Sequence, residues 1–319
     1  MIELKFKPDE LHALAGGQVI VRGLSAENSK GLAAFGAVVA DATPNAFIES
    51  YRTLAIFDHN PHVLASGRLS ATPSLEDFKG LVLDNDDLYA LAKCRLQESD
   101  MKLSEQDIAR FQSIVDSASR LTPALKARLL AEYKKLLVER ARTYLAKGSP
   151  ALGAFADKQE AVEVHESFVS LAREQSASAR HCDHLYSQLV EYPAGSAPDS
   201  ESFIYWAKQK FGSLKPVIHL VHVLIHREGS RVFIASKQIY SSHYTEAGLS
   251  VAELTPFTDN KGQFHTLILY WIRLQVDMLG GTLGFMKKRM VQPRMRRTLK
   301  ESLNKVRLAM EEPGSVSAN

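Results

Sequence analysis

The chain has 319 residues, of which 45% are hydrophobic and 24% are charged. These are the proportions of an ordinary globular protein, and they exclude a chain that is disordered throughout. The net charge of +3 is too small to indicate a nucleic-acid partner by itself.

The cysteines and the longest apolar runs indicate which kinds of site and segment are not expected. Cys94 and Cys182 form no CxxC pair and have no neighbouring ligand cluster, so we expect two unrelated thiols and no zinc site. A disulfide between them would require an oxidising compartment. The longest apolar runs, such as residues 266–272, have the length of a strand and cannot cross a bilayer. The first residues lack the apolar segment of a signal peptide, so we expect a periplasmic protein only if a signal has been removed, and otherwise a cytoplasmic one.

The N-terminal part predicts a strand, a turn and a helix. Residues 18–24 alternate weakly between apolar and polar side chains, as in a short strand. Residues 31–42 are small and apolar. Thr43 and Pro44 then form a helix start, with Thr43 as the N-cap and Pro44 at the first helical position, and this helix is expected to continue to about Leu54.

The middle of the chain is predicted to be helical. Ser104 is a suitable N-cap for one helix, and residues 123–147 form a second, longer helix that follows Thr-Pro and precedes Gly. Apolar residues recur at helical spacing over residues 158–174, and a shorter helix is expected to end near Tyr192. Residues 193–200 are rich in Pro, Ser and Ala and indicate a linker or long loop.

After this loop the pattern changes to strands. Strands are expected at residues 216–227, 232–240, 247–257 and 264–279, with turns at 228–230 and 259–262 and a final helix at 285–311. The sequence therefore predicts an α+β fold. Its parts are an antiparallel, helix-grip-like sheet, a long C-terminal helix, and an inserted or separate helical block.

Three histidines, His219, His222 and His226, stand in the first of these strands. On a helix their spacing would place three imidazoles on one face. On a strand, which the flanking Val and Ile residues favour, His219 points away from the other two. A metal site would then need ligands from elsewhere, so we expect no metal.

A run of polar residues interrupts the next strand. On a regular strand the side chains of Ser236, Gln238 and Tyr240 share one amphipathic face, which is typical of a pocket wall. A strand with one solvated side fits the same pattern. His243 and Tyr244 follow and, with Tyr240, could hold a proton-transfer group. No matched nucleophile or acid–base pair accompanies them, so no catalytic residue is assigned.

The last predicted strand carries both aromatic and charged residues. Alternation places Arg273 and Asp277 on one face and Tyr270 on the other. Two interpretations stay open. The charged residues form ion pairs on the outer face of the sheet, or a buried Arg–Asp network holds an anionic head group.

The final helix is amphipathic and basic. Its apolar stripe, which is expected to pack on the sheet, consists of Met295, Leu299, Leu303, Val306 and Met310. We expect either a solvated helix face or contact with an anionic membrane surface. The residues expected to make that contact are Lys287, Lys288, Arg289, Arg294, Arg296 and Arg297. Nucleic acid is not expected, because no aromatic residues are interleaved with the basic ones.

Known signatures of enzymes are missing from the chain. It contains no GxGxxG, Walker A, HExxH or GxSxG motif, so we expect no cofactor, and nothing in the sequence requires an enzyme.

The order of strand, helix, antiparallel strands and long C-terminal helix resembles the helix-grip fold of the START-like (SRPBCC) superfamily. The stretches 215–216, 236–244 and 273–277 are also similar to a group of uncharacterised bacterial proteins that are often exported. Ser99 stands where that group has a second cysteine, so a local disulfide with Cys94 is not expected. The resemblance implies a cavity for a lipid or another hydrophobic small molecule between sheet and helix.

On this resemblance the chain divides into three parts. Residues 1–57 join the C-terminal sheet, residues 58–211 form a mainly helical insertion or cap, and residues 212–319 form the sheet and final helix. The leading hypothesis is non-catalytic binding or transfer of a lipid or other hydrophobic small molecule. The candidate ligand-binding residues are His222, Gln238, Tyr240, His243, Tyr244, Tyr270, Arg273 and Asp277.

Two alternatives use other features of the chain. The first is an enzyme of cyclase or hydrolase type in the same pocket, with His243, Tyr240 or His222 as the acid or base. The second is an interaction scaffold whose contact surface is the helical block at residues 104–190. The sequence does not predict the ligand or the oligomeric state.

Overall fold

One antiparallel sheet organises the computed structural model, which describes residues 6–58, 60–115, 121–178, 183–194, 200–281 and 284–311. The sheet has eight strands in the order β1-β2-β10-β9-β8-β7-β6-β3. The bounds are β1 Ile20–Leu24, β2 Gly31–Ala40, β3 Val63–Arg68, β6 Ser200–Gln209, β7 Val217–Glu228, β8 Arg231–Ser241, β9 Thr245–Thr258 and β10 Phe264–Val276. With the helices described next, this sheet confirms the predicted α+β fold.

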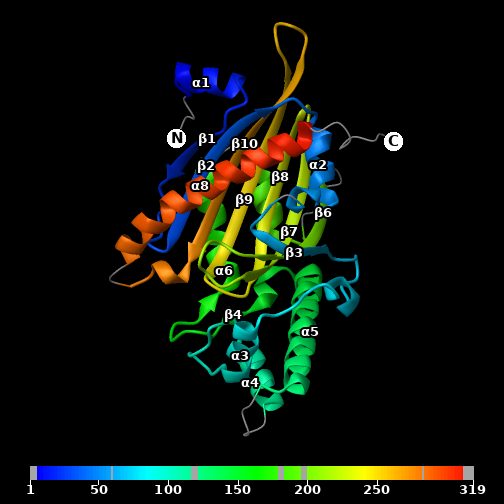
Figure 1. The fold of residues 1–319 in the computed structure, drawn as a ribbon, viewed down its shortest axis with the longest axis vertical. Helices are drawn as coiled ribbons and strands as arrows, with labels where there is room; N and C mark the ends of the chain where they lie inside the picture. Colours follow the sequence, from blue (N-terminus) through cyan, green and yellow to red (C-terminus); the bar gives the residue numbers. More distant parts are fainter. Residues whose placement is uncertain are drawn as a thin grey trace.

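Helices cover both faces of the sheet (Figure 1). One face, called the α8 face, lies against the long C-terminal helix α8 (Gly284–Glu311) and α2 (Pro44–Arg52). The opposite face, called the α6 face, lies against α6 (Val164–Ser178) and α7 (Asp183–Glu191), with α1 (Pro8–Ala15) near β2 and β10. The apolar stripe predicted for the last helix packs as expected, because Leu299, Leu303 and Met310 are buried against the sheet.

The helical block lies between β3 and β6 in the chain and gathers at one end of the sheet (Figure 1). Its further elements are α3 (Asn85–Lys93), α4 (Glu105–Ile114), α5 (Pro123–Lys147) and the short strands β4 (Ala154–Phe155) and β5 (Val162–Glu163). Ser104 Oγ accepts a hydrogen bond from the Asp107 backbone, which confirms the predicted cap of α4. Gly148, with φ of 73°, ends α5 as predicted. The helix expected over 158–174 starts later, at Val164, because β5 first pairs with β4.

The two strands β3 and β6 were not predicted. Both fall within residues 58–211, the part expected to be mainly helical, yet β6 pairs with β7 over ten residues and β3 extends the sheet by pairing with β6. The predicted 264–279 strand is shorter in the structure, because residues Asp277–Leu279 form a 3-10 turn after β10. None of the helices in the described ranges has an apolar stretch long enough to cross a membrane.

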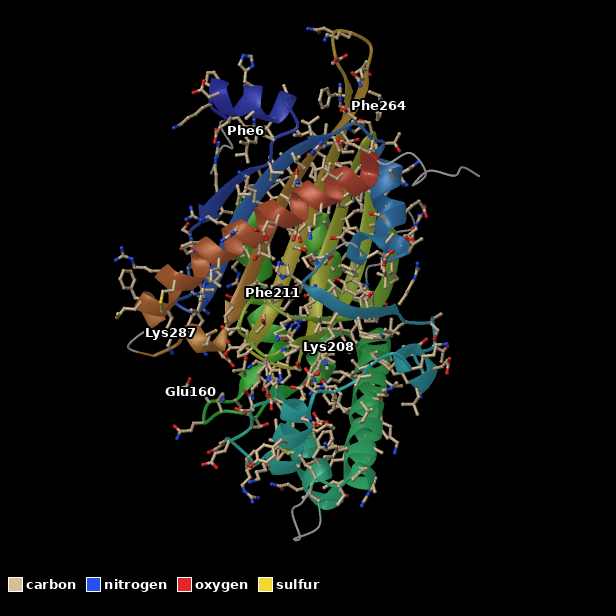
Figure 2. The ribbon with its side chains drawn as sticks, viewed as in Figure 1. Phe6, Glu160, Lys208, Phe211, Phe264 and Lys287 are labelled. Carbon is tan, nitrogen blue, oxygen red and sulfur yellow. The ribbon has the colours of Figure 1, made fainter. Side chains whose placement is uncertain are left out.

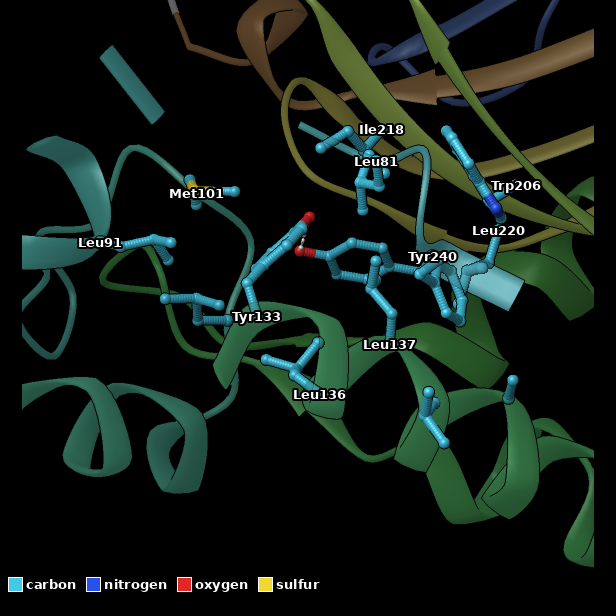
Figure 3. Packing of buried hydrophobic residues seen from close by; sticks show 14 of the residues in the cluster. Leu81, Leu91, Met101, Tyr133, Leu136, Leu137, Trp206, Ile218, Leu220 and Tyr240 are labelled. Atoms are coloured by element: carbon cyan, nitrogen blue, oxygen red, sulfur yellow. Dashed lines mark hydrogen bonds between the residues drawn. The ribbon is translucent and has the colours of Figure 1, made fainter. Parts of the chain in front are cut away.

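A β-bulge in β8 changes which face its last residues occupy. Val221 of β7 pairs with Gln238, but Leu220 pairs with Tyr240, so Ile239 is an extra residue in β8. Tyr240 therefore lies with Leu220 on the α6 side, in the core formed with α5, as Figure 3 shows. The prediction that Tyr240 shares a face with Gln238 is wrong, because regular alternation does not hold across a bulge.

Candidate functional site

The middle of the α8 face is incompletely covered. Ile234, Ala252 and Ile268 on this face are buried to 2% exposure or less. Farther along the same strands, a row of side chains on this face stays half-buried. These residues are His219 and Val221 of β7, Gln238 of β8, Ser250 of β9, and Tyr270, Ile272 and Leu274 of β10. Central strands have no free edge, so this residual exposure means that the elements on this face cover that area only in part. We call this area the recess.

Two walls border the recess. On one side, Val291 and Met295 of α8 are half-buried and pack beside the sheet. On the other side, the Phe57 ring lies 5.2 Å from the ring of Tyr205, which belongs to β6. The segment before β3 then approaches α8, since His62 Nε2 lies 3.9 Å from a carboxylate oxygen of Glu301. The recess is therefore flanked by α8 and by the segment that joins α2 to β3.

An aromatic contact extends this second wall. The ring of Phe211, just after β6, lies 5.6 Å from the His62 ring, and Figure 2 shows Phe211 near the segment that enters β3. Both side chains are half-buried. The wall thus combines two parts of the chain that are far apart in sequence.

The polar groups in the recess are uncharged at neutral pH. Burial lowers the pKa of His219 to about 4, although a hydrogen bond with Gln238 acts in the opposite direction. Burial also raises the pKa of Tyr270, whose side chain hydrogen-bonds with Ser250. Tyr51 of α2, hydrogen-bonded to Ser236 nearby, has its pKa raised by burial as well. The recess therefore offers hydrogen-bonding groups without charge, within a mainly apolar surface.

Of the predicted site residues, Gln238 and Tyr270 line the recess, and Tyr244 lies at its end. The Tyr244 hydroxyl accepts a hydrogen bond from the Lys215 backbone at 3.2 Å, and its ring packs near Leu274 and Val291. His219 is a recess residue that sequence reasoning missed as a site residue. Alternation had correctly separated it from His222, but the neighbour that gives it a role, Gln238, lies on another strand.

His222 lies on the α6 face, away from the recess. Its Nδ1 atom is 2.9 Å from the hydroxyl of Tyr144 on α5, and its side chain is 1% exposed. Burial lowers the pKa of His222 to about 3, with the nearby Lys237 lowering it further. The ring of Tyr192 lies 4.4 Å from the His222 ring and helps to close this position. His222 is therefore a neutral, sealed residue of the interface between sheet and helical block.

Tyr240 and His243 also face the helical block. The Tyr240 hydroxyl accepts a hydrogen bond from the Tyr133 hydroxyl at 3.1 Å (Figure 3). His243 Nε2 lies 2.9 Å from Asp87 Oδ1, and its Nδ1 lies 2.8 Å from the Asp100 carbonyl oxygen. Both side chains are buried, so they connect the end of β8 with α3, α5 and the loop at Asp100.

Arg273 and Asp277 do not form the Arg–Asp network considered from the sequence. Arg273 donates to Glu174 at 2.9 Å and to Gln175 at 3.0 Å, both on α6, and it is 3% exposed. Asp277 accepts from Lys102 Nζ at 2.9 Å. The alternative of ion pairs on a solvated outer face is wrong for Arg273, because α6 covers that face.

The described residues contain no group of three or more His, Cys, Asp or Glu side chains arranged to hold a metal ion. Cys94 is a free, buried thiol whose pKa burial raises to about 11, while Cys182 lies outside the described residues, so the pairing of the two is not described. Comparison with protein-family models and with the curated proteins gave no match to this chain, so its function has to be inferred from the geometry of the recess.

Proposed function

We propose that this protein binds a lipid or another hydrophobic small molecule in the recess between the sheet and α8. The observation that carries the proposal is the row of half-buried residues across four central strands under a helix that packs on the rest of the face. Ligand pockets are concave and mainly apolar, with a few polar groups that fix orientation. His219, Gln238 and Tyr270 supply such groups here, and Val221, Ile272 and Met295 supply apolar surface.

Binding is favoured over catalysis by the chemistry of these groups. General acid–base catalysis requires a group whose pKa lies near the working pH and which reaches the substrate. His219 reaches the recess, but its pKa is about 4. At neutral pH it is therefore a neutral imidazole, which can accept a hydrogen bond but cannot act as a cationic proton donor. The residues of the enzyme hypothesis, His222, Tyr240 and His243, are buried against the helical block instead.

The scaffold hypothesis lacks a contact surface in the part of the chain it used. All of the strongly exposed large apolar side chains in the described parts of the chain lie outside residues 104–190. Buried residues of this block, such as Tyr133, Leu136 and Leu137, pack inward instead (Figure 3). A packed block is better suited to support the sheet than to recruit a partner.

The test begins with native mass spectrometry of the purified protein and with solvent extraction of any bound apolar molecule. A titration with a fluorescent fatty-acid analogue then compares Ser250→Trp, which fills the centre of the recess, with Ser230→Trp at the exposed turn between β7 and β8. We expect the recess variant to lose at least about tenfold in affinity and the turn variant to bind as the wild type does. Equal binding by both variants, or no ligand and no binding at all, would contradict the proposal. Ser250→Leu is a smaller change that fills less of the recess if the Trp variant unfolds.

A further inference from the structure

The first two turns of α8 expose three large apolar side chains. Phe285 is 71% exposed, Met286 is 62% exposed and Met290 is 61% exposed. These three lie within six residues. They stand at the outer end of α8, where Figure 2 places Lys287 at the margin of the molecule. Water-exposed apolar side chains concentrated in this way mark a contact surface.

These side chains share one face of the helix with basic residues. Successive residues of an α-helix turn by about 100°. On this basis Phe285, Met286 and Met290 fall on the same half of α8 as the exposed basic residues. Those residues are Arg289, Arg294, Arg296, Arg297 and Lys300. The opposite half carries Met295 and Leu299, which pack against the sheet, while Leu303 lies at the border between the halves, in line with Phe285. The exposed half is therefore apolar at its start and cationic along its length; we call it the basic face.

Acidic side chains do little to neutralise the basic face. No Asp or Glu occurs from Gly284 to Lys300. Arg297 pairs with Glu301 at 3.2 Å, and Glu10, which lies across an open groove lined by Arg296, Arg297 and Lys300, is already paired with Arg22. The excess positive charge thus remains available for an anionic partner.

We propose that the basic face docks on an anionic lipid bilayer, with Phe285, Met286 and Met290 inserted among the acyl chains and the Arg and Lys side chains at the phosphates. Helices that lie in the membrane interface combine these two features. Each Lys or Arg near an anionic surface strengthens binding roughly fivefold, and the inserted apolar side chains add a contribution that salt does not screen. Nucleic acid would use the same charges but would leave the three apolar side chains in water.

Docking in this orientation would also bring the recess close to the bilayer. Val291, which directly follows Met290, and Met295, just over one turn farther along, form the α8 wall of the recess. The docking inference itself stands on the exposed half of α8 and does not require that the recess holds a ligand.

Two binding measurements test the docking. In the first, the full chain is sedimented with vesicles of pure phosphatidylcholine or of phosphatidylcholine mixed with phosphatidylglycerol, at low salt and at about 1 M salt, where the screening length falls to about 3 Å. In the second, Phe285→Trp reports insertion by its fluorescence, because the native Trp206 and Trp271 are 2% and 4% exposed and do not meet the lipid. We expect binding only to the anionic vesicles, loss at high salt, and a blue shift of the new tryptophan.

Variants separate the two contributions to binding. Replacement of Phe285, Met286 and Met290 together by Ser should weaken vesicle binding at least about tenfold. Arg294→Gln should weaken it roughly fivefold. The matched control is Leu308→Ser, an apolar residue 46% exposed at the other end of α8, which should bind as the wild type does.

Three results would overturn the docking. The first is that the protein binds both kinds of vesicle equally. The second is that the triple Ser variant binds anionic vesicles as tightly as the wild type does. The third is that the protein binds duplex DNA as tightly as vesicles and that the triple Ser change does not weaken the DNA binding. The fatty-acid titration is repeated on the triple Ser variant, whose changed side chains are exposed and are not among the recess residues. If the triple Ser variant binds the fatty-acid analogue and the wild type does not bind vesicles, the docking alone is refuted. If the variant does not bind the analogue and the wild type binds vesicles, the recess proposal alone is refuted.

Discussion

Gly36 provides a sharp test of how α8 sits on the sheet. This residue lies in β2 directly beneath α8, and a Cβ atom added there would lie 2.4 Å from Leu303 Cδ1 and 3.5 Å from Leu299 Cδ2. Carbon atoms in contact are normally about 3.5–4.0 Å apart. In Gly36→Ala the Leu303 side chain must therefore move by about 1 Å or more, within a core where it is 3% exposed.

Two opposing effects determine how much Gly36→Ala lowers the free energy of unfolding. Overpacking of a filled core costs about 1–3 kcal/mol. Alanine also has less conformational freedom than glycine in the unfolded chain, which stabilises the folded state by about 0.4–1 kcal/mol because Gly36 does not adopt a positive φ. We expect Gly36→Ala to lose about 1–2 kcal/mol in equilibrium urea unfolding. Gly80→Ala is the control, because nothing lies within 4 Å of its added Cβ, and its stability should stay within about 0.5 kcal/mol of the wild type.

A double-mutant cycle identifies the contact responsible. Leu303→Ala alone should cost about 2–5 kcal/mol, because it leaves a cavity under α8. In the double variant the new methyl group of Ala at position 36 occupies part of that cavity, so the combined loss should be smaller than the sum by about 1–2 kcal/mol. Wild-type stability of Gly36→Ala, or additivity within about 0.5 kcal/mol, would show that α8 does not press on β2 at this position.

Three further predictions concern the helical block and its interface with the sheet. Glu174→Met should lower the free energy of unfolding by about 3 kcal/mol, because it removes the carboxylate that pairs with buried Arg273. The double change with Arg273→Met should recover most of that loss. Urea unfolding checks both variants, and a double variant no more stable than the single one would contradict this prediction. Burial lowers the pKa of Lys237 from 10.5 to about 7, so the unfolded chain binds more protons between these values and stability rises with pH there. The rise should be about 2 kcal/mol from pH 7 to pH 9 in thermal or urea unfolding, and Lys237→Met should abolish it; parallel curves for the two proteins would refute this assignment. Ser104→Ala should cost about 1 kcal/mol by removing the cap shared with Asp107, measured as a lower unfolding midpoint, and an unchanged midpoint would mean that the cap adds no stability.

The elements with local signals could be predicted from the sequence. α5 begins after Thr122 and ends at Gly148 because a side-chain cap and a positive φ act within one turn of the helix ends. The hairpin between β7 and β8 was placed for the same reason, since Gly229 with φ of 59° makes the turn. Such signals depend on neighbours in sequence and need no knowledge of the rest of the fold.

Features that depend on distant pairing could not be predicted. Residues 200–209 become a strand because β7 offers ten residues to pair with, and the segment follows directly after a region rich in Pro and Ser. The bulge at Ile239 arises from the register between β7 and β8, which no local pattern encodes. For the candidate site, Gln238 and Tyr270 were found by alternation, whereas Tyr240 and Arg273 were misplaced because their surroundings come from α5 and α6.

The two faces of the sheet use similar residue types for different purposes. On the α6 face, charged and titratable groups are buried and mostly paired, as in Arg273 with Glu174 or His243 with Asp87, although Asp87 Oδ2 and His222 Nε2 have no hydrogen-bond partner among the described residues. Burial without such partners would cost several kcal/mol per charged group, so these ion pairs are what allows the charged groups to be buried there.

In the recess, the polar side chains of His219, Gln238 and Tyr270 keep partial contact with solvent and carry no charge at neutral pH. His219 is the clearest case, because the same imidazole group that is sealed at His222 is here half-buried and hydrogen-bonded to an amide, with a pKa of about 4. A neutral imidazole in this position can orient a hydroxyl or carboxyl group of a ligand, but a cationic one would be needed to hold an anion by charge. Solvent access, more than residue type or protonation state, therefore separates the candidate binding surface from the structural interface behind it, because both histidines are neutral.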